Sequence, residues 1–248
     1  MSDARTLLDA ARRVLFVHAH PDDETLATGG LIAALAERGV TIAVLTASRG
    51  EQGELVPGSV PAGVDLVTHR EAEVAAACRA LGVRHQTFLG GVGARGAGRE
   101  PRRYTDSGMV WLDQAETVAG PGASAGPDAL SLADPDEIAA DIAAYARGFL
   151  ADLVVSYDDG GGYGHPDHVA LAAPSRAAAA EVGVPFLEVA SELGAAGWTV
   201  RTPEQLGRVQ QALSHHASQV TVEGADVVHV GGQRQPIQLA FTLRVPGS

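Results

Sequence analysis

The chain has 248 residues, 46% of them apolar and 4% aromatic, which is enough for one large α/β domain with an aliphatic core. Its formal charge of −12 argues against a nucleic acid as the main partner. All 18 basic residues are arginines, which excludes a phosphate-loop lysine, a Schiff-base lysine and a pyridoxal-phosphate anchor. Cys78 is the single cysteine, so an internal disulfide and a cysteine zinc site are excluded as well.

The sequence contains no membrane or export signal. No apolar run approaches the roughly 18 to 20 residues that a membrane span needs. Residues 1–5 lack the charged-then-apolar pattern of a signal peptide. We therefore expect a cytoplasmic protein with no membrane partner.

The first half of the chain alternates between strands and helices. The apolar pattern predicts three buried strands, at residues 14–18, 40–47 and 87–89. It also predicts two helices, at residues 25–38 and 68–81, each ended by a glycine. This alternation indicates an α/β fold with a Rossmann-like, mostly parallel sheet flanked by helices.

The second half continues the alternation and then becomes irregular. Acidic residues at 134–137 predict the start of a helix that runs to Phe149. A strand at 153–157 and an Ala-rich helix at 166–182 follow, and a further helix is expected at 203–217. We expect a catalytic domain over residues 1–184 and a C-terminal segment over residues 185–248 that packs on it and completes the site.

Two short clusters of imidazoles and carboxylates carry most of the functional information. One is His20-Pro-Asp-Asp-Glu24 and the other is Tyr163-Gly-His-Pro-Asp-His168, and each directly follows a predicted buried strand. A single His-Pro-Asp is usually a turn, but two such clusters at strand ends predict one divided metal site. A catalytic zinc takes three protein ligands and keeps a position for water, so the pattern predicts a metal-dependent hydrolase.

These motifs resemble those of the PIG-L/LmbE family of zinc-dependent N-acetylglucosaminide deacetylases. The resemblance also covers residues 48–54 and 68–73, and it extends from about residue 12 to about residue 180. Residues 104–109 and 215–219 are similar to the group that deacetylates N-acetylglucosaminyl-inositol in mycothiol biosynthesis. The segment after Val220 departs from that pattern and is shorter.

The resemblance implies that His20, Asp23 and His168 hold one zinc ion per chain. Two imidazoles and one carboxylate leave the metal a net positive charge, which lowers the pKa of bound water toward neutrality. The same ligands also suit Fe²⁺. Asp22 would be the general base, the alternative being that it caps the following helix.

Three residues of the second cluster are expected to assist. His165, as an imidazolium, would stabilise the oxyanion or protonate the leaving amine. Asp167 would orient a histidine, either His165 or His168. Tyr163 would polarise the carbonyl oxygen, unless it is only a packed aromatic of a glycine-rich loop.

Two further residues match positions that bind sugar and inositol hydroxyls in the family. Arg70 offers a planar fork of donors and Asp106 accepts from a diol, so both suit a polyol. The alternative for Arg70 is a surface ion pair with Glu73 on the same helix.

The expected function is removal of the N-acetyl group from an N-acetylglucosamine-containing small molecule, with N-acetylglucosaminyl-inositol as the leading substrate. The alternatives are an amidase of mycothiol S-conjugates, a deacetylase of another N-acyl amino sugar and a catalytically inactive sugar-binding protein. A Rossmann oxidoreductase is disfavoured because the glycine fingerprint is missing. The sequence leaves a homo-oligomeric state open.

Overall fold

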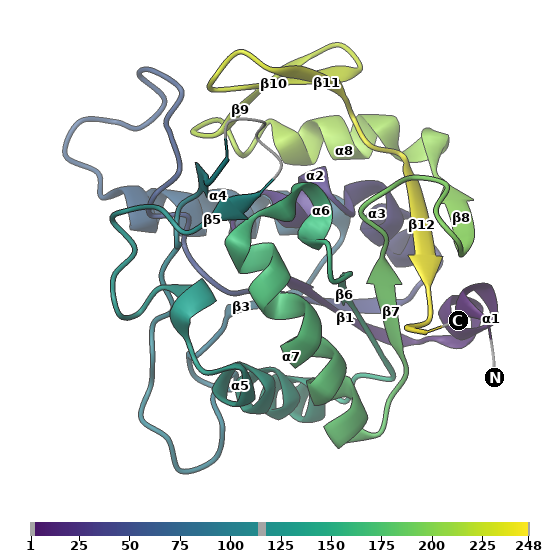
Figure 1. Ribbon diagram of the computed structural model, residues 1–248. Helices are drawn as coiled ribbons and strands as arrows, with labels where there is room; N and C mark the ends of the chain where they lie inside the picture. Colours follow the sequence, from purple (N-terminus) through teal and green to yellow (C-terminus); the bar gives the residue numbers. More distant parts are fainter. Residues whose placement is uncertain (1–2, 114–117, 248) are drawn as a thin grey trace.

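The computed structural model describes residues 3–113 and 118–247. Its centre is a seven-stranded sheet with the order β3-β2-β1-β6-β7-β12-β8 (Figure 1). The strands are β1 Arg13–His18, β2 Thr41–Thr46, β3 His85–Phe88, β6 Leu153–Tyr157, β7 Phe186–Val189, β8 Trp198–Arg201 and β12 Ala240–Arg244. The pairings from β3 to β7 are parallel, and β12 is antiparallel to both neighbours. The predicted α/β fold with a mostly parallel sheet is confirmed.

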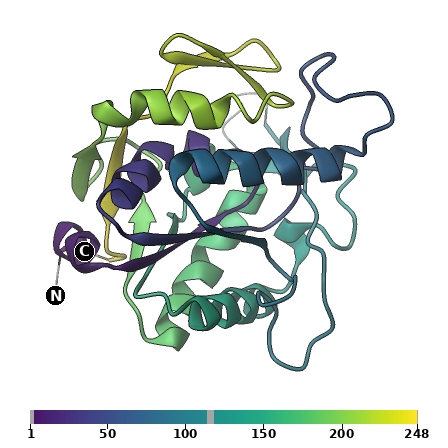
Figure 2. The same cartoon turned by 180° about the vertical axis from the view of Figure 1, so that it is seen from behind.

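Helices cover both faces of the sheet, and the side chains of successive strand residues pack alternately into two separate hydrophobic cores. Val14 and Phe16 of β1 pack with the helices of one face, whereas Leu15 and Val17 pack with those of the other. The first face carries α1 Ala4–Ala10, α3 Gly29–Glu37, α4 Leu66–Leu81 and α8 Leu206–Leu213. The second carries α5 Pro135–Phe149 and α7 Pro166–Val182 (Figures 1 and 2). In the described ranges, no helix is long and apolar enough to cross a membrane.

Most predicted elements are present, with their expected signals at the ends. Helix α7 has the predicted bounds, and α5 begins after Asp134, whose side chain accepts from the amide of Asp136. Helix α4 ends at Gly82, which has a φ of 91° that favours glycine.

The predicted helix over residues 25–38 is wrong in one respect. The chain forms a short helix α2, Asp23–Leu26, and then a separate helix α3. The break is at Thr28, whose hydroxyl donates to the carbonyl of Glu24 and lies 2.9 Å from His18 Nε2. A β-branched residue that bonds locally in this way competes with the helical ladder.

The helix predicted over residues 203–217 is shorter than expected. It starts as a 3₁₀ turn at Pro203–Gln205, and α8 ends at Leu213. The next residues form tight turns that bring His216 to the protein interior. The chain continues into a ribbon of β9 Val220–Glu223, β10 Asp226–His229 and β11 Arg234–Pro236.

The residues after 184 contribute to the main sheet as well as to this ribbon. Strands β7, β8 and β12 all come from this part of the chain. A second small ribbon, β4 Val110–Trp111 with β5 Ala119–Gly120, lies within the connection between β3 and α5. The sheet is thus built from both sides of residue 184, and a division of the chain there stays a prediction.

The topology places the two motifs next to each other. Strand β1 pairs in parallel with β2 on one side and with β6 on the other, so the order of strands reverses at this point. In open α/β sheets the crevice outside the carboxyl ends of such strands is where ligands bind. The segments after β1 and β6 both enter this crevice.

Candidate active site

Six functional side chains of the two motifs converge at the carboxyl ends of β1 and β6. His20 and Asp23 follow β1 directly, and α2 starts at Asp23. A glycine-rich loop containing α6, Gly161–Gly164, connects β6 to His165, which precedes α7. His168 then lies in the first turn of α7. Four of these side chains are buried, namely His20, Asp23, His165 and His168. Asp22 is half-buried and Tyr163 is exposed.

Three of the converging atoms have the spacing of ligands around one ion. His20 Nδ1 lies 3.4 Å from Asp23 Oδ2, which lies 3.2 Å from His168 Nε2. The two imidazole nitrogens are 3.3 Å apart. Tetrahedral zinc ligands about 2.0 to 2.1 Å from the metal lie roughly 3.3 to 3.4 Å from one another. The three side chains therefore fit the metal that the sequence implies.

The other ring nitrogen of each histidine has a partner that leaves the inner nitrogen free to bind a metal. His168 Nδ1 is 3.1 Å from the carbonyl oxygen of Gly161, so Nδ1 carries the hydrogen. His20 Nε2 is 3.0 Å from a carboxylate oxygen of Asp167 and donates to it. Such outer hydrogen bonds are the usual support of metal-binding histidines.

Two other groups of buried side chains also bring potential ligand atoms within 4.8 Å of one another: His20 with His165 and His168, and His20 with Asp106 and Asp167. In the second of these, His20 Nε2 lies 3.0 Å from Asp167 and 3.6 Å from Asp106. His165 Nδ1 accepts from the backbone amide of Asp167, and both Asp106 oxygens accept from backbone amides. Asp23 Oδ2 also accepts from the His20 amide and the Tyr157 hydroxyl. The mutual spacing of 3.2 to 3.4 Å is therefore what favours His20, Asp23 and His168 as the ligand set.

The partner of Asp167 differs from both expected alternatives. The hydrogen bond of its carboxylate goes to His20, across the crevice, rather than to His165 or His168. From the first turn of α7 the side chain reaches back toward the segment after β1, while His168 is already held by a backbone carbonyl. Ser107 holds the carboxylate from the other side through its amide at 2.9 Å and its hydroxyl at 2.5 Å.

Tyr157, the last residue of β6, was not identified from the sequence. Its hydroxyl donates to Asp23 Oδ2 at 2.9 Å and accepts from the amide of Ala19 at 3.0 Å. Its ring stacks on that of His168, with the centroids 4.3 Å apart. Its position at the end of a strand that leads to the motif was the available signal; for Ser107 only the family-like segment at 104–109 was available.

Asp22 has a strained backbone and a carboxyl that is not used for capping. Its φ is 112°, which costs a non-glycine residue about 1 to 3 kcal/mol. It occupies the N-cap position of α2, but its side chain makes no capping hydrogen bond, so the capping alternative is not observed. Burial, followed by the charges of Asp23 and Glu24, raises the pKa of Asp22 to about 8. A carboxyl with a pKa near neutrality suits a general base.

His165 is neutral in this environment, in contrast to the imidazolium expected from the sequence. Burial, together with the nearby rings of His20 and His168, lowers the pKa of His165 to about 3. Because Nδ1 accepts from a backbone amide, the single hydrogen is on Nε2. His165 can therefore donate a hydrogen bond without carrying a charge. Tyr163, 62% exposed, stands edge-on to His165 with the ring centroids 5.9 Å apart, so it is not a packed core aromatic.

Arg70 is buried against the loop at residues 48–54, whereas Asp106 lies next to the metal-site histidine His20. Arg70 is 1% exposed, and its guanidinium donates to the carbonyls of Gly50, Gly53 and Glu54. The surface ion pair considered for it is therefore wrong, and the side chain holds the loop at residues 48–54 from below. Asp106 lies at the crevice, with one carboxylate oxygen 3.6 Å from His20 Nε2.

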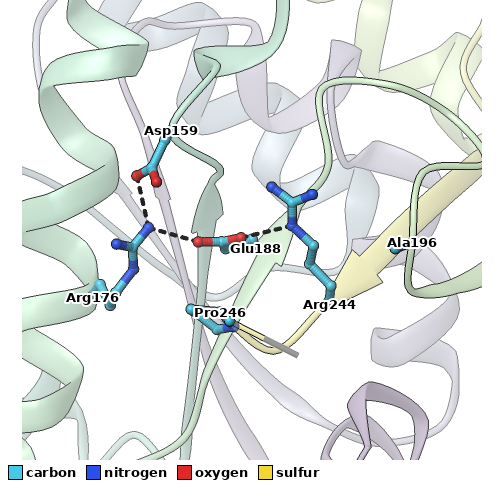
Figure 3. Close-up of a pocket in the computed structure, with 7 residues that line it drawn as sticks. Asp159, Arg176, Glu188, Ala196, Arg244 and Pro246 are labelled. Carbon is cyan, nitrogen blue, oxygen red and sulfur yellow. Dashed lines mark hydrogen bonds and ion pairs between the residues drawn. The ribbon is translucent and has the colours of Figure 1, made fainter.

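A separate charged network supports the glycine-rich loop that carries Tyr163. Ser191 Oγ accepts from the amide of Gly162 at 2.9 Å and donates to Asp158. Asp158 in turn accepts from Arg244. Arg244 also binds Glu188 (Figure 3). A cavity of about 300 Å³ lies beside this network, and its two arginines are paired with carboxylates. We assign the network a structural role.

Comparison with known proteins identifies the family. A family model described as PIG-L, GlcNAc-PI de-N-acetylase, matches residues 15–179. The chain belongs to the PIG-L family. The resemblance drawn from the sequence is thereby confirmed.

Two curated relatives bear the same name, 1D-myo-inositol 2-acetamido-2-deoxy-alpha-D-glucopyranoside deacetylase. The one from Kineococcus radiotolerans is 42% identical over 83% of this chain and 53% of its own length. The one from Rhodococcus erythropolis is 35% identical over 92% of this chain and 88% of its own length. The chain thus spans about half the length of the first relative.

The solved structure of N,N'-diacetylchitobiose deacetylase from Pyrococcus horikoshii has the same fold. Its TM-score is 0.60 at 18% identity, over 87% of this chain and 73% of that one. At this identity the likeness supports the fold alone.

We expect His168→Ala to abolish stoichiometric zinc binding, because it removes one of three ligands and leaves two. Zinc content after dialysis, measured by atomic absorption, checks this, and circular dichroism checks the fold. His229→Ala, in the ribbon at β10, is the matched control and should retain full zinc. Full occupancy in His168→Ala would remove His168 from the ligand set.

We also expect zinc affinity to fall as the pH is lowered through neutrality. Burial opposes protonation of His20, but hydrogen bonds to Asp167 and Asp23 hold its pKa well above 6.5. At neutral pH the metal must therefore displace a proton from this ring, which costs about ten-fold in affinity per pH unit. Titrations between pH 6 and 8 in buffers of different ionisation enthalpy measure the proton released. A pH-independent affinity would contradict the assignment.

Proposed function

We propose that this protein is a zinc-dependent deacetylase that removes the acetyl group from an N-acetylglucosamine-containing substrate, with N-acetylglucosaminyl-inositol as the expected one. The observation that carries the proposal is the set of three ligand atoms 3.2 to 3.4 Å apart. Asp22 is next to one of them in the chain, and its carboxyl makes no capping hydrogen bond. The names of the two relatives support the substrate.

His20, Asp23 and His168 would hold the zinc ion. When bound, zinc supplies Lewis-acid chemistry at this position, lowering the pKa of water and polarising a carbonyl. The protein's own groups provide the proton transfers. Asp22, whose pKa lies near neutrality, takes the proton from the attacking water. His165, neutral with its hydrogen on Nε2, donates to the oxygen that becomes negative in the tetrahedral intermediate.

The second proton transfer goes to the amine that leaves. Asp22, now protonated, is the acid within the site that can return its proton to that nitrogen. His165 is a poor candidate for this step because its imidazolium form, with a pKa near 3, is scarcely populated at neutral pH. Tyr163 stands at the mouth of the crevice, where its exposed hydroxyl can approach the substrate carbonyl or the sugar.

The polyol part of the substrate is proposed to lie along Asp106. The carboxylate is fixed by the amides of Gln52 and Gly108, and it lies at the edge of the metal site rather than within it. Arg70 is proposed to act on the substrate through the loop that it holds, since three carbonyls of that loop already occupy its guanidinium.

The deciding experiment measures acetate release from N-acetylglucosaminyl-inositol, from plain N-acetylglucosamine and from a mycothiol S-conjugate. We expect zinc-dependent release with the first substrate fastest. Asp22→Asn should keep zinc and lower kcat by about 10² to 10⁴-fold, the usual scale for a lost general base. Preferred cleavage of the S-conjugate would assign the amidase function, and no hydrolysis by the zinc-loaded protein would leave a binding protein.

Asp106→Ala should reduce kcat/KM more for the inositol-bearing substrate than for N-acetylglucosamine. A hydrogen bond to a charged group is worth about 1.5 to 3 kcal/mol, so the difference should be about ten-fold or more. Asp106→Asn is the paired variant, since it keeps the size and one acceptor. An equal loss on both substrates would mean that Asp106 supports the loop or the metal site instead.

A further inference from the structure

A buried pair outside the motif ligands connects the C-terminal part of the chain to Asp22. Glu24 and His216 are both 0% exposed, and Glu24 Oε1 lies 2.7 Å from His216 Nε2. The second oxygen of the same carboxylate accepts from the backbone amide of Asp22 at 3.0 Å. The three groups form a chain from His216 through Glu24 to Asp22.

The tautomer of His216 is fixed by its surroundings. The ionised carboxylate of Glu24 can only accept, so Nε2 of His216 carries a hydrogen toward Glu24 Oε1. Thr25 adds a second donor to the same carboxylate oxygen at 2.5 Å. Burial opposes a charge on His216, but the negative Glu24 more than offsets this and raises its pKa.

The hydrogen bond from the Asp22 amide to Glu24 forms at a residue whose backbone conformation is strained. Asp22 and Leu150 are the two described non-glycine residues with a positive φ. Without an external partner, the amide of Asp22 would be free to turn back to an ordinary conformation and take the carboxyl with it. Glu24 lies two residues further along the chain and holds that amide in place, and His216 prevents the carboxylate from rotating away.

We propose that His216 and Glu24 act as positioning residues for catalysis, holding Asp22 in its strained conformation so that its carboxyl faces the attacking water. This inference rests on the proposed function of Asp22 as the base. Neither residue touches the expected metal ligands through its hydrogen bonds, and His216 lies outside the region that the family model matches.

The test compares Glu24→Ala, Glu24→Gln and His216→Ala with the control His215→Ala, which alters the neighbouring, half-buried histidine. We expect Glu24→Ala and His216→Ala to keep one zinc per chain and a KM within about two-fold for N-acetylglucosaminyl-inositol. Their kcat should fall by about 10 to 100-fold, the scale of a catalytic group displaced by a fraction of an ångström to an ångström. Glu24→Gln, which keeps an acceptor for the Asp22 amide, should recover most of the rate.

Each variant is also combined with Asp22→Asn. If the pair acts through Asp22, adding His216→Ala or Glu24→Ala to Asp22→Asn should lower kcat less than two-fold further. Multiplicative losses, or loss of zinc together with activity, would overturn the inference. His216→Ala leaves a buried carboxylate without its partner, so Glu24→Gln against Glu24→Ala decides the matter if that variant does not fold.

A second measurement does not depend on activity. In zinc-free, ¹⁵N-labelled protein the Asp22 amide should resonate downfield because it donates to a carboxylate, and it should move upfield in Glu24→Ala but not in His215→Ala. An unchanged resonance would overturn the inference. Normal turnover by Asp22→Asn would instead reject the proposed base while this spectrum still reports on the hydrogen bond.

Discussion

The parallel pairing of β1 with β6 is the constraint on which the site depends. The register from Val14 with Leu153 to Phe16 with Val155 brings the ends of the two strands together, although their motifs are separated by more than half of the chain. Both ligand distances to His168 depend on this pairing, since His20 and Asp23 come from the segment after β1 and His168 from the start of α7. The buried aliphatic residues on both faces keep that register fixed.

Packing carboxylates against imidazoles in the interior sets the charges of the site before any metal enters. Burial alone would raise the pKa of Asp23, but the charge and hydrogen bond of His168 hold it well below its usual value. Burial also opposes ionisation of Asp167, but the hydrogen bond and charge of His20 lower the pKa of its carboxyl. Asp23 and Asp167 are therefore ionised and His20 is protonated in the metal-free site. A divalent metal ion that replaces this proton adds one positive charge among these carboxylates.

The sequence predicted the parts of the fold and site that follow from short-range patterns. The bounds of α7, the glycine that ends α4 and the acidic start of α5 are all local signals. What it missed depends on contacts between distant segments. The break at Thr28 depends on His18 in β1, the partner of Asp167 lies across the crevice, and the role of Tyr157 requires β6 to lie beside the loop after β1. The neutral state of His165 likewise arises from two rings that only the fold brings near it.

Arg70 illustrates why an accurate motif can still mislead about what a residue touches. Its type suits a polyol, but three carbonyls that point to one place need a planar fork of donors, which only arginine supplies. The loop that it secures then presents the amide of Gln52 to Asp106, and Glu51 of the same loop accepts from the Asp106 amide. The carboxylate nearest the expected polyol is thus fixed through the loop, so the identity of residue 70 can govern substrate binding without any direct contact.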